Sequence, residues 1–303
     1  MHWLRLKWIL TRAIMADRHT NTIPLSDETF RQIRDLLHET CGVYYDDGSK
    51  FIMEMRLQGA LLRRQVESFQ DYYFFLKYDG DRTGEMENLI DLLTVHETYF
   101  FREERQLRAF SEEILPAIHA DPVARERKRL RVWSAGCSTG EEPYTLSMLI
   151  LEQDLFKDWK VEILGSDISQ NVLQSARTGL YQGASLRSID PYFLSKYFQK
   201  EGNRYKILDT VKRPVSFLHL NLFFPDKWVF MSDMDVIFCR NVIIYFNQEV
   251  KKKVSRGFHR CLKEGGHLVL GHSESLINIS TEYALCHLKN DIVYRKPQAG
   301  VPV

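Results

Sequence analysis

The spacing of hydrophobic residues changes near residue 130 of this 303-residue chain. Between residues 24 and about 120, apolar positions recur three and four residues apart, which places them on one side of an α-helix. Ser26 and the two acids after it are typical of a helix start, and Gly42 is typical of a helix end. We therefore expect an all-helical segment, with helices over 26–41, 50–66 and 85–94 and an aromatic stretch over 69–78 that packs them together.

From residue 130 onward, short apolar runs alternate with helical patterns, which is the order typical of a parallel sheet. We expect parallel strands at 130–135, 161–166, 215–220, 235–239 and 267–270, followed by an antiparallel strand at 292–295. The expected helices lie at 143–153, 170–177 and 247–262, the last closed by Gly265 and Gly266. The segment 192–213 interrupts this order and predicts a small inserted β element.

The fold class is therefore α/β, with an all-helical N-terminal domain followed by a Rossmann-like domain that carries a small β-subdomain. A chain of this length is expected to form one large or two modest domains. The limits we expect are an extension over 1–20, a helical domain over 21–120, an α/β domain over 121–303 and a β-subdomain at about 192–214.

The first 19 residues mix Trp3 and Trp8 with basic side chains. They lack the uninterrupted apolar run and the small-residue cleavage site of a signal peptide. A basic amphipathic helix that lies on a membrane surface is one interpretation. We favour a dispensable extension that precedes an alternative start at Met15.

Composition narrows the class of protein. Lys and Arg number 41 and Asp and Glu 40, so the net charge is +1 and nucleic acid is not the expected partner. We interpret the charged run 124–131 as a solvated linker. No apolar run approaches the roughly 20 residues of a membrane span, so no stable membrane insertion is expected.

The five cysteines lack CxxC spacing, which favours reduced thiols in a cytoplasmic protein. They are Cys41, Cys137, Cys239, Cys261 and Cys286. A monomer is the default expectation.

The segment 130–144, LRVWSAGCSTGEEPY, is the most informative stretch. It reads as a strand, a glycine turn and a helix start, an arrangement that places ligands at the carboxyl end of the strand. Glu141 and Glu142 suit the positive end of the helix dipole but would repel a phosphate. A ligand with ribose hydroxyls and a positive centre fits better, and S-adenosylmethionine is the candidate that we favour.

Polar residues also follow the later strands. Asp167 ends the second strand, where an acid typically hydrogen-bonds ribose, although it could also cap the next helix. Asn221 and Leu222 end the third strand and together suit an adenine ring, which offers a polar edge and an apolar face.

The fourth strand leads into Arg240 and Asn241, polar groups that are costly at the end of a buried strand unless they are paired. The hydroxyl of Tyr245 would likewise need a partner. Near residue 100, Phe100, Phe101 and Arg102 fit either core packing beside a surface charge or a lid over a cofactor.

Two other patterns point elsewhere. Residues 136–140 match the G-x-S-x-G turn of α/β-hydrolases, and Asp167 and His272 would keep the chain order of a triad. The turn follows the first strand rather than a later one, so we do not favour a hydrolase. His267 and His272 near Glu274 lack metal-binding spacing, and no metal site is expected.

The motifs HETYFFRE, RVWSAGCSTGEEPY, SDIS, LNLF, IFCRNVIIYF and GHSE, in this order, resemble the CheR-type chemotaxis receptor methyltransferases. The resemblance covers about residues 24–296. It implies a helical N-terminal domain, a class I S-adenosylmethionine-dependent methyltransferase domain and methyl esterification of glutamates on the cytoplasmic helices of chemoreceptors. It also implies that Tyr245 lies near the transferred methyl group and that His96 replaces a common Asn. The cofactor contacts that it implies are His96, Thr98, Arg102, Glu142, Asp167, Asn221, Leu222, Arg240 and Asn241.

The resemblance further implies that a basic second helix, which keeps Lys50 and Arg56, docks the receptor, although such side chains could simply be solvated. Gly59 and Ala60 stand where relatives can have further arginines, so docking would rely on Arg63 and Arg64 instead. The short β insert argues against docking on a receptor's C-terminal peptide. Arg102 and Arg240 are the residues expected to hold carboxylates of the cofactor or substrate. Two alternatives stay open: a methyltransferase acting on another carboxylate or small molecule, and a non-catalytic cofactor-binding module.

Overall fold

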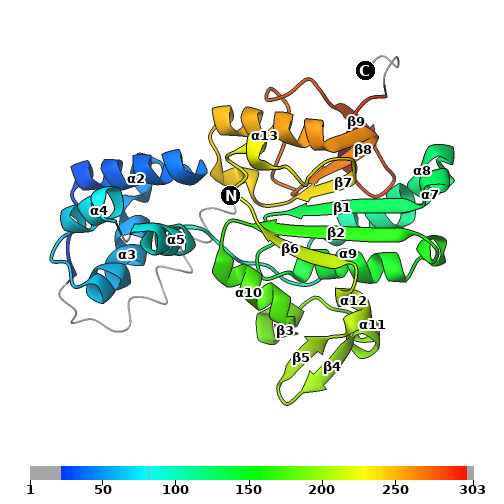
Figure 1. The fold of residues 1–303 in the computed structure, drawn as a ribbon, viewed down its shortest axis with the longest axis horizontal. Coiled ribbons are helices and arrows are strands. Elements are labelled where there is room, and N and C mark those ends of the chain that lie inside the picture. The colour runs from blue at the N-terminus through cyan, green and yellow to red at the C-terminus, as the bar shows by residue number, and fades with distance from the viewer. Residues whose placement is uncertain (1–21, 81, 299–303) are drawn as a thin grey trace.

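The computed structural model describes residues 22–80 and 82–298, and it has three parts (Figure 1). The predicted extension over 1–20 lies outside the described residues. A lobe of helices stands on one side of a larger α/β part, and a small β-sheet projects from the edge of the latter. The helical lobe contains α2 (Asp27–Cys41), α3 (Lys50–Arg64), α4 (Phe69–Tyr78) and α5 (Arg82–Leu93).

Helix α2 begins and ends where its sequence predicts. The Ser26 hydroxyl accepts a hydrogen bond from the Thr29 backbone N–H at 3.1 Å, which caps the first turn. Gly42 adopts φ +76° and stops the helix. A Cβ at Gly42 would lie 2.6 Å from the Phe223 ring, so the same glycine lets the helical lobe approach the α/β part closely.

The large sheet has the strand order β6–β2–β1–β7–β8–β10–β9. The first five strands are parallel, and β10 runs antiparallel to both of its neighbours. This confirms the mixed sheet that the alternating pattern predicts, with β9 as the strand that the pattern did not predict. In chain order the strands are β1 (Arg129–Ala135), β2 (Lys160–Asp167), β6 (Val215–His219), β7 (Met234–Cys239), β8 (Leu262–Leu270), β9 (Ala284–His287) and β10 (Ile292–Arg295).

Helices cover both faces of this sheet. Val132 and Phe238 lie in a cluster with the helices around residues 107–115 and with α9, whereas Trp133 and Ile237 pack with α13. This alternation along β1 and β7 is expected of strands buried on both faces. The α-helices of this part are α6 (Glu104–Ala109), α7 (Leu115–Ala120), α8 (Pro122–Arg127), α9 (Glu141–Leu151), α10 (Gln170–Thr178) and α13 (Gln248–Cys261), with a π-helical turn at Phe110–Ile114. The 3-10 turns of the chain are Asp47–Ser49, Asp154–Phe156, Gly183–Leu186, Pro225–Lys227 and Ile243–Tyr245.

The small sheet has the order β3–β5–β4 and is antiparallel. It includes a strand before residue 192, so the sequence pattern located only part of it. Phe100 inserts among its aromatic residues, 4.8 Å from Tyr181 and 5.1 Å from Phe198 between ring centroids. Its elements are β3 (Leu180–Tyr181), α11 (Pro191–Tyr197), β4 (Phe198–Glu201), β5 (Arg204–Ile207) and α12 (Asp209–Lys212).

Two local expectations were wrong. Helix α13 is not closed by the glycine pair: it ends at Cys261, and β8 begins at Leu262. Gly265, at φ +75°, lies instead where the pairing of β8 with β7 shifts register, so it serves a bulge within the strand. The run 124–131 is exposed over 125–128, as expected, but it is not a linker, because α8 extends through Arg127, whose guanidinium donates to Asp235 at 2.9 Å, and β1 begins at Arg129.

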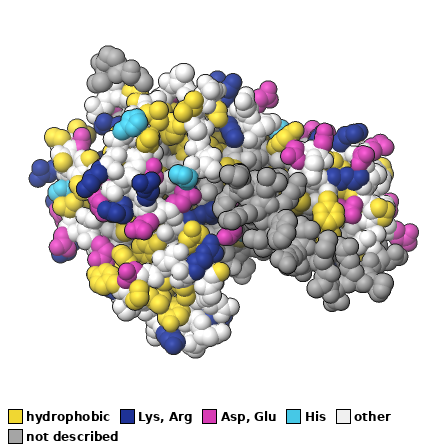
Figure 2. All heavy atoms as spheres, turned by 180° about the vertical axis from the view of Figure 1, so that it is seen from behind, with side chains coloured by type: hydrophobic (Ala, Val, Ile, Leu, Met, Phe, Trp, Pro, Cys, Tyr) yellow, Lys and Arg dark blue, Asp and Glu magenta, His cyan; other side chains and the backbone are white. Residues whose placement is uncertain are grey.

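The surface is mixed in charge. In the described part of the face in Figure 2, Lys and Arg side chains are interspersed with Asp and Glu and do not form one large basic patch.

Among residues 22–80 and 82–298, every helix is too short or too polar to span a bilayer. The five cysteines are all free thiols.

Glu85 is a buried carboxylate that links α3, α4 and α5 of the helical lobe by hydrogen bonds. Glu85 accepts hydrogen bonds from Arg64 Nε at 2.5 Å, the Tyr72 hydroxyl at 2.8 Å and Asn88 Nδ2 at 2.8 Å. Burial raises the pKa of Glu85, but the hydrogen bonds outweigh it and the net pKa is lowered. Its stabilising effect is therefore present above the unfolded-state pKa and disappears as the pH falls through the folded-state pKa.

We predict that Glu85→Gln lowers the free energy of unfolding by about 1–3 kcal/mol near neutral pH, because it weakens a charged hydrogen-bond network. The difference from wild type should shrink as the pH falls below the unfolded-state pKa of a glutamate, about 4.3, and through the lowered folded-state pKa, where the wild-type carboxylate becomes protonated. Urea unfolding at a series of pH values measures it. The matched control is Glu87→Gln on the exposed side of the same helix. An equal, pH-independent effect of both substitutions would contradict the prediction.

Candidate functional site

The turn after β1 contains three residues with positive φ. Gly136 and Gly140 adopt φ +81° and +92°, and Ser138 adopts φ +48°. A Cβ at Gly136 would overlap Cγ2 of Val242, so this position requires glycine for both its conformation and its space. The N–H groups of Gly136 and Cys137 donate to the carbonyl of Ser166 at 2.8 and 2.9 Å, which binds the turn to the end of β2.

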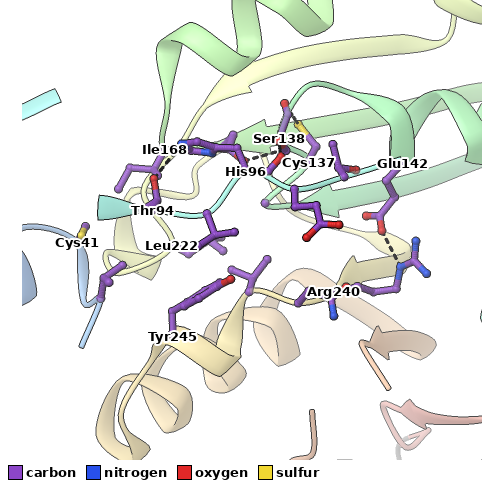
Figure 3. A pocket seen from close by; sticks show the side chains of 18 of the residues that line it. Cys41, Thr94, His96, Cys137, Ser138, Glu142, Ile168, Leu222, Arg240 and Tyr245 are labelled. Carbon is purple, nitrogen blue, oxygen red and sulfur yellow. Dashed lines mark hydrogen bonds and ion pairs between the residues drawn. The ribbon is translucent and has the colours of Figure 1, made fainter. Parts of the chain in front are cut away.

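A pocket opens at this turn, at the carboxyl ends of β1, β2, β6 and β7 (Figure 3). Its empty space, counted together with the open mouth, is about 920 Å³. The structure thus gathers into one cavity residues that lie up to 205 positions apart in the chain, from Cys41 to Phe246. The lining includes every pocket residue that the sequence suggested, namely His96, Thr98, Arg102, Glu142, Asp167, Asn221, Leu222, Arg240, Asn241 and Tyr245. Their individual roles in binding stay predictions.

Asp167 is buried and is hydrogen-bonded to the glycine turn after β1. Its Oδ2 accepts a hydrogen bond from the Ser138 N–H at 2.8 Å, and its Oδ1 accepts one from the Ser169 N–H at 3.0 Å. The cap of α10 is a different residue, Ser169, whose hydroxyl accepts from the Val172 N–H. Burial raises the pKa of Asp167, and the two N–H donors oppose that effect. Each carboxylate oxygen has a second lone pair, so Asp167 can also accept hydrogen bonds from ligand hydroxyls.

The partly buried Glu142 and the buried Arg240 form an ion pair across the pocket floor. Glu142 Oε2 accepts from Arg240 Nε at 2.6 Å, and Oε1 accepts from the Ser134 hydroxyl at 2.7 Å (Figure 3). Arg240 Nη1 donates to the Arg102 carbonyl at 2.7 Å and to Gln106 Oε1 at 3.2 Å. Two of the three guanidinium nitrogens of Arg240 therefore bind the protein itself, and its main effect on a ligand is exerted through Glu142.

Arg102 and Tyr245 present more available groups. Arg102 Nη1 donates to the Glu97 carbonyl at 2.9 Å, a bond that leaves several guanidinium N–H groups for other acceptors. The Tyr245 ring points into the pocket, and its hydroxyl has no hydrogen-bond partner in the described chain. Burial raises the pKa of Tyr245, while the positive charges of Arg102 and Arg56 act in the opposite direction. The Tyr245 hydroxyl is therefore a proton donor near neutral pH.

The end of β6 contributes a polar anchor and an apolar wall. Asn221 Nδ2 donates to the Thr40 carbonyl at 2.8 Å, and its Oδ1 accepts from the Phe223 N–H at 3.0 Å. The Asn221 amide thus ties the helical lobe to the sheet, a role that the sequence did not indicate. Leu222 is buried beside it and lines the cavity.

The hydrolase alternative requires a histidine ring that accepts the proton of the Ser138 hydroxyl, and the described residues do not place one there. The Ser138 hydroxyl donates to the backbone carbonyl of His96 at 2.8 Å rather than to a histidine ring. The His96 ring instead contacts the Thr94 hydroxyl at 3.0 Å. In the described part of the chain no three His, Cys, Asp or Glu side chains gather as metal ligands.

Sequence reasoning missed the wall that the helical lobe contributes. Cys41 and Val43 line the pocket, held there by a backbone bridge between Val43 and Phe246 and by a 2.9 Å hydrogen bond from the Tyr44 N–H to the Tyr245 carbonyl. These contacts join residues about 200 positions apart, and no local pattern at 41–43 signals them.

The four basic residues of α3 differ in their surroundings. Lys50 pairs with Asp27, and Arg64 pairs with the buried Glu85. Arg56 turns inward, where its Nη1 donates to the Thr94 carbonyl at 3.3 Å. Arg63 is exposed. Their use in docking stays a prediction; Arg63 and Arg64 are the exposed residues of the four, Lys50 is half-buried and Arg56 points inward.

The glycine turn gives a direct test of the pocket. Gly136→Ala should destabilise the fold by about 1–3 kcal/mol more than Gly202→Ala, because both glycines have positive φ but only Gly136 is crowded. Urea unfolding measures the difference. The substitution should also displace Val242 and reduce ligand affinity in the pocket. Equal destabilisation by the two substitutions would show that the turn has more space than the structure indicates.

Comparisons with known proteins agree with this geometry. Residues 28–94 match the model of the CheR methyltransferase all-alpha domain, and residues 96–292 match that of the CheR methyltransferase SAM binding domain. The chain is 33% identical over 284 residues to chemotaxis protein methyltransferase 2 of Vibrio cholerae, covering 92% of this chain and 96% of that protein. It is 34% identical over 265 residues to the chemotaxis protein methyltransferase of Borreliella burgdorferi, covering 86% and 92% of the two chains. The chain therefore belongs to the CheR family of S-adenosylmethionine-dependent chemotaxis methyltransferases.

Proposed function

We propose that this methyltransferase esterifies glutamate side chains on the cytoplasmic helices of chemoreceptors. The observation that carries the proposal is the corner of the pocket where Arg102, with free guanidinium N–H groups, and the unpartnered Tyr245 hydroxyl lie beside the carboxylate-lined floor. A cation and a neutral hydroxyl are suited to receive a carboxylate. The enzyme would act in the cytoplasm as a monomer.

The residues present fit S-adenosylmethionine. Asp167 offers lone pairs for the ribose hydroxyls, and Leu222 offers an apolar surface for the adenine. The acidic lining from Glu142 and Asp167 favours a positively charged ligand. When bound, S-adenosylmethionine supplies an electrophilic methyl group on its sulfonium.

The substrate needs little activation by the protein. A glutamate carboxylate is ionised near neutral pH and is itself the nucleophile, so no general base is required. Arg102 would hold a carboxylate, of the cofactor or of the substrate, by charge-assisted hydrogen bonds. Tyr245 would orient the reacting groups through its hydroxyl. Catalysis then depends on positioning and on the exclusion of water rather than on proton transfer.

The outer face of α3 would receive the receptor. Arg63 and Arg64 are exposed there and Lys50 is half-buried, and a negatively charged receptor helix would complement them. Arg56 would support this face from within through the Thr94 carbonyl, and the buried Glu85 would hold Arg64 in place within it. The small sheet β3–β5–β4 would not be needed for tethering to a receptor's C-terminal peptide.

We predict that Arg102→Ala lowers methyl transfer to a chemoreceptor cytoplasmic fragment by at least about 100-fold, because a positioned charged donor is lost. The assay follows tritiated methyl groups into alkali-labile esters. Arg105→Ala, an exposed arginine one turn along, is the matched control and should keep wild-type activity. The thermal unfolding midpoint should change little in either variant.

Full activity of the Arg102→Ala variant would overturn the role given to Arg102. Wild-type enzyme that binds the cofactor but transfers no methyl group to any receptor fragment of its source organism would overturn the proposed substrate.

A further inference from the structure

Glu274 lies behind the pocket wall and binds four backbone N–H groups. Its Oε2 accepts from Asn241 at 2.7 Å and from Gly271 at 2.7 Å. Its Oε1 accepts from Val242 at 2.8 Å and from Ile244 at 3.2 Å. Glu274 itself is not among the residues that line the pocket. A single carboxylate thus satisfies most of the donors of the turn that follows β7.

This turn has a conformation that needs support. Asn241 adopts φ +60°, a left-handed conformation that is unfavourable for a residue with a side chain. Successive N–H groups that point to one side form a concavity that binds an anion. Without an anion, the N–H groups of Asn241 and Val242 would be left without hydrogen bonds in the interior, at a penalty for each. Glu274 is therefore the counter-charge that makes this turn stable.

The supported turn forms part of the pocket. Asn241, Val242 and Tyr245 all line the cavity, and Val242 packs against the space that Gly136 leaves free. The turn also follows Arg240 directly, so its shape affects the angle at which that side chain meets Glu142. A small movement of residues 241–245 would shift one wall of the pocket and the Tyr245 hydroxyl together.

Glycine at position 271 keeps the carboxylate close. A Cβ at Gly271 would lie 2.7 Å from Glu274 Oε2 and 2.9 Å from the Asn241 backbone nitrogen. Both the end of β8 and the turn after β7 are thereby fastened to the same carboxylate. The spacing of Gly271 and Glu274, three residues apart, lets the segment fold back on itself through the hydrogen bond from the Glu274 N–H to the Gly271 carbonyl at 2.9 Å.

We propose that Glu274 is a positioning residue of this methyltransferase: as a fixed, partly buried anion it holds residues 241–245 in the shape that binds the cofactor and places Tyr245. The proposal rests on the cofactor pocket and, for its effect on turnover, on the proposed function. Cofactor affinity can be measured without any receptor, so failure of the proposed substrate and failure of this inference give different results.

The test compares Glu274→Gln with Glu282→Gln, an exposed carboxylate eight residues further along. A glutamine amide would turn an NH₂ group toward two of the N–H donors, so the turn should loosen. We expect the dissociation constant for S-adenosylhomocysteine, measured by calorimetry, to rise at least about tenfold in Glu274→Gln, as loss of hydrogen bonds to a charged group implies. Glu282→Gln should bind as the wild type does.

Hydrogen exchange separates positioning from general destabilisation. In Glu274→Gln, amide exchange should accelerate in residues 241–246 while the β1 and β7 amides keep their protection. With saturating cofactor and an accepted receptor fragment, kcat should fall while the KM for the receptor stays near the wild-type value. Wild-type affinity for S-adenosylhomocysteine, or equal acceleration of exchange throughout the sheet, would overturn the proposal.

A second variant keeps the test decisive if Glu274→Gln does not fold. Glu274→Asp retains the charge but is one methylene shorter, so its carboxylate cannot reach all four N–H groups. We expect it to fold and to bind S-adenosylhomocysteine less tightly than the wild type but more tightly than any folded Glu274→Gln protein. Affinity of Glu274→Asp equal to that of the wild type would contradict the role of Glu274.

Discussion

The ion pair between the buried Arg240 and the partly buried Glu142 is the interaction on which the rest of the site depends. It joins the end of β7 to the first turn of α9, 98 positions earlier in the chain, at 2.6 Å. Removing two charges from water is unfavourable unless their remaining hydrogen-bonding groups are also satisfied. Here Ser134, Gln106 and the Arg102 carbonyl satisfy these groups. The segment around Arg102, which leads from the helical lobe to the sheet, is therefore held by the same network.

The sheet topology explains why a pocket forms there. From β1 the chain first adds β2 and β6 on one side, and it then returns to add β7 and β8 on the other. The crevice outside the carboxyl ends of β1 and β7 is the point where the strand order reverses, the usual ligand site of open parallel sheets. The helical lobe closes one side of this crevice through the bridge from Val43 to Phe246. The pocket is thus shared between two parts of the chain.

Local sequence patterns were sufficient for the five parallel strands, for β10 and for the strand-end residues, but not for β3 and β9. The apolar runs fixed the strand positions because burial on both faces requires them, and Gly136, Asp167 and Arg240 stand out because their residue types are unusual at strand ends. Contacts between distant segments were not predictable in this way. The bulge at Gly265, the inward turn of Arg56 and the wall at Cys41 depend on partners that only the folded chain brings close.

The most direct test of the account is calorimetry of S-adenosylhomocysteine binding to the wild type and to Asp167→Ala. The account predicts tight one-to-one binding by the wild type and a loss of at least about tenfold in the variant, because Asp167 both braces the glycine turn and accepts ligand hydrogen bonds. Undiminished affinity in Asp167→Ala, or no binding by the wild type, would contradict the claim that this pocket is the cofactor site.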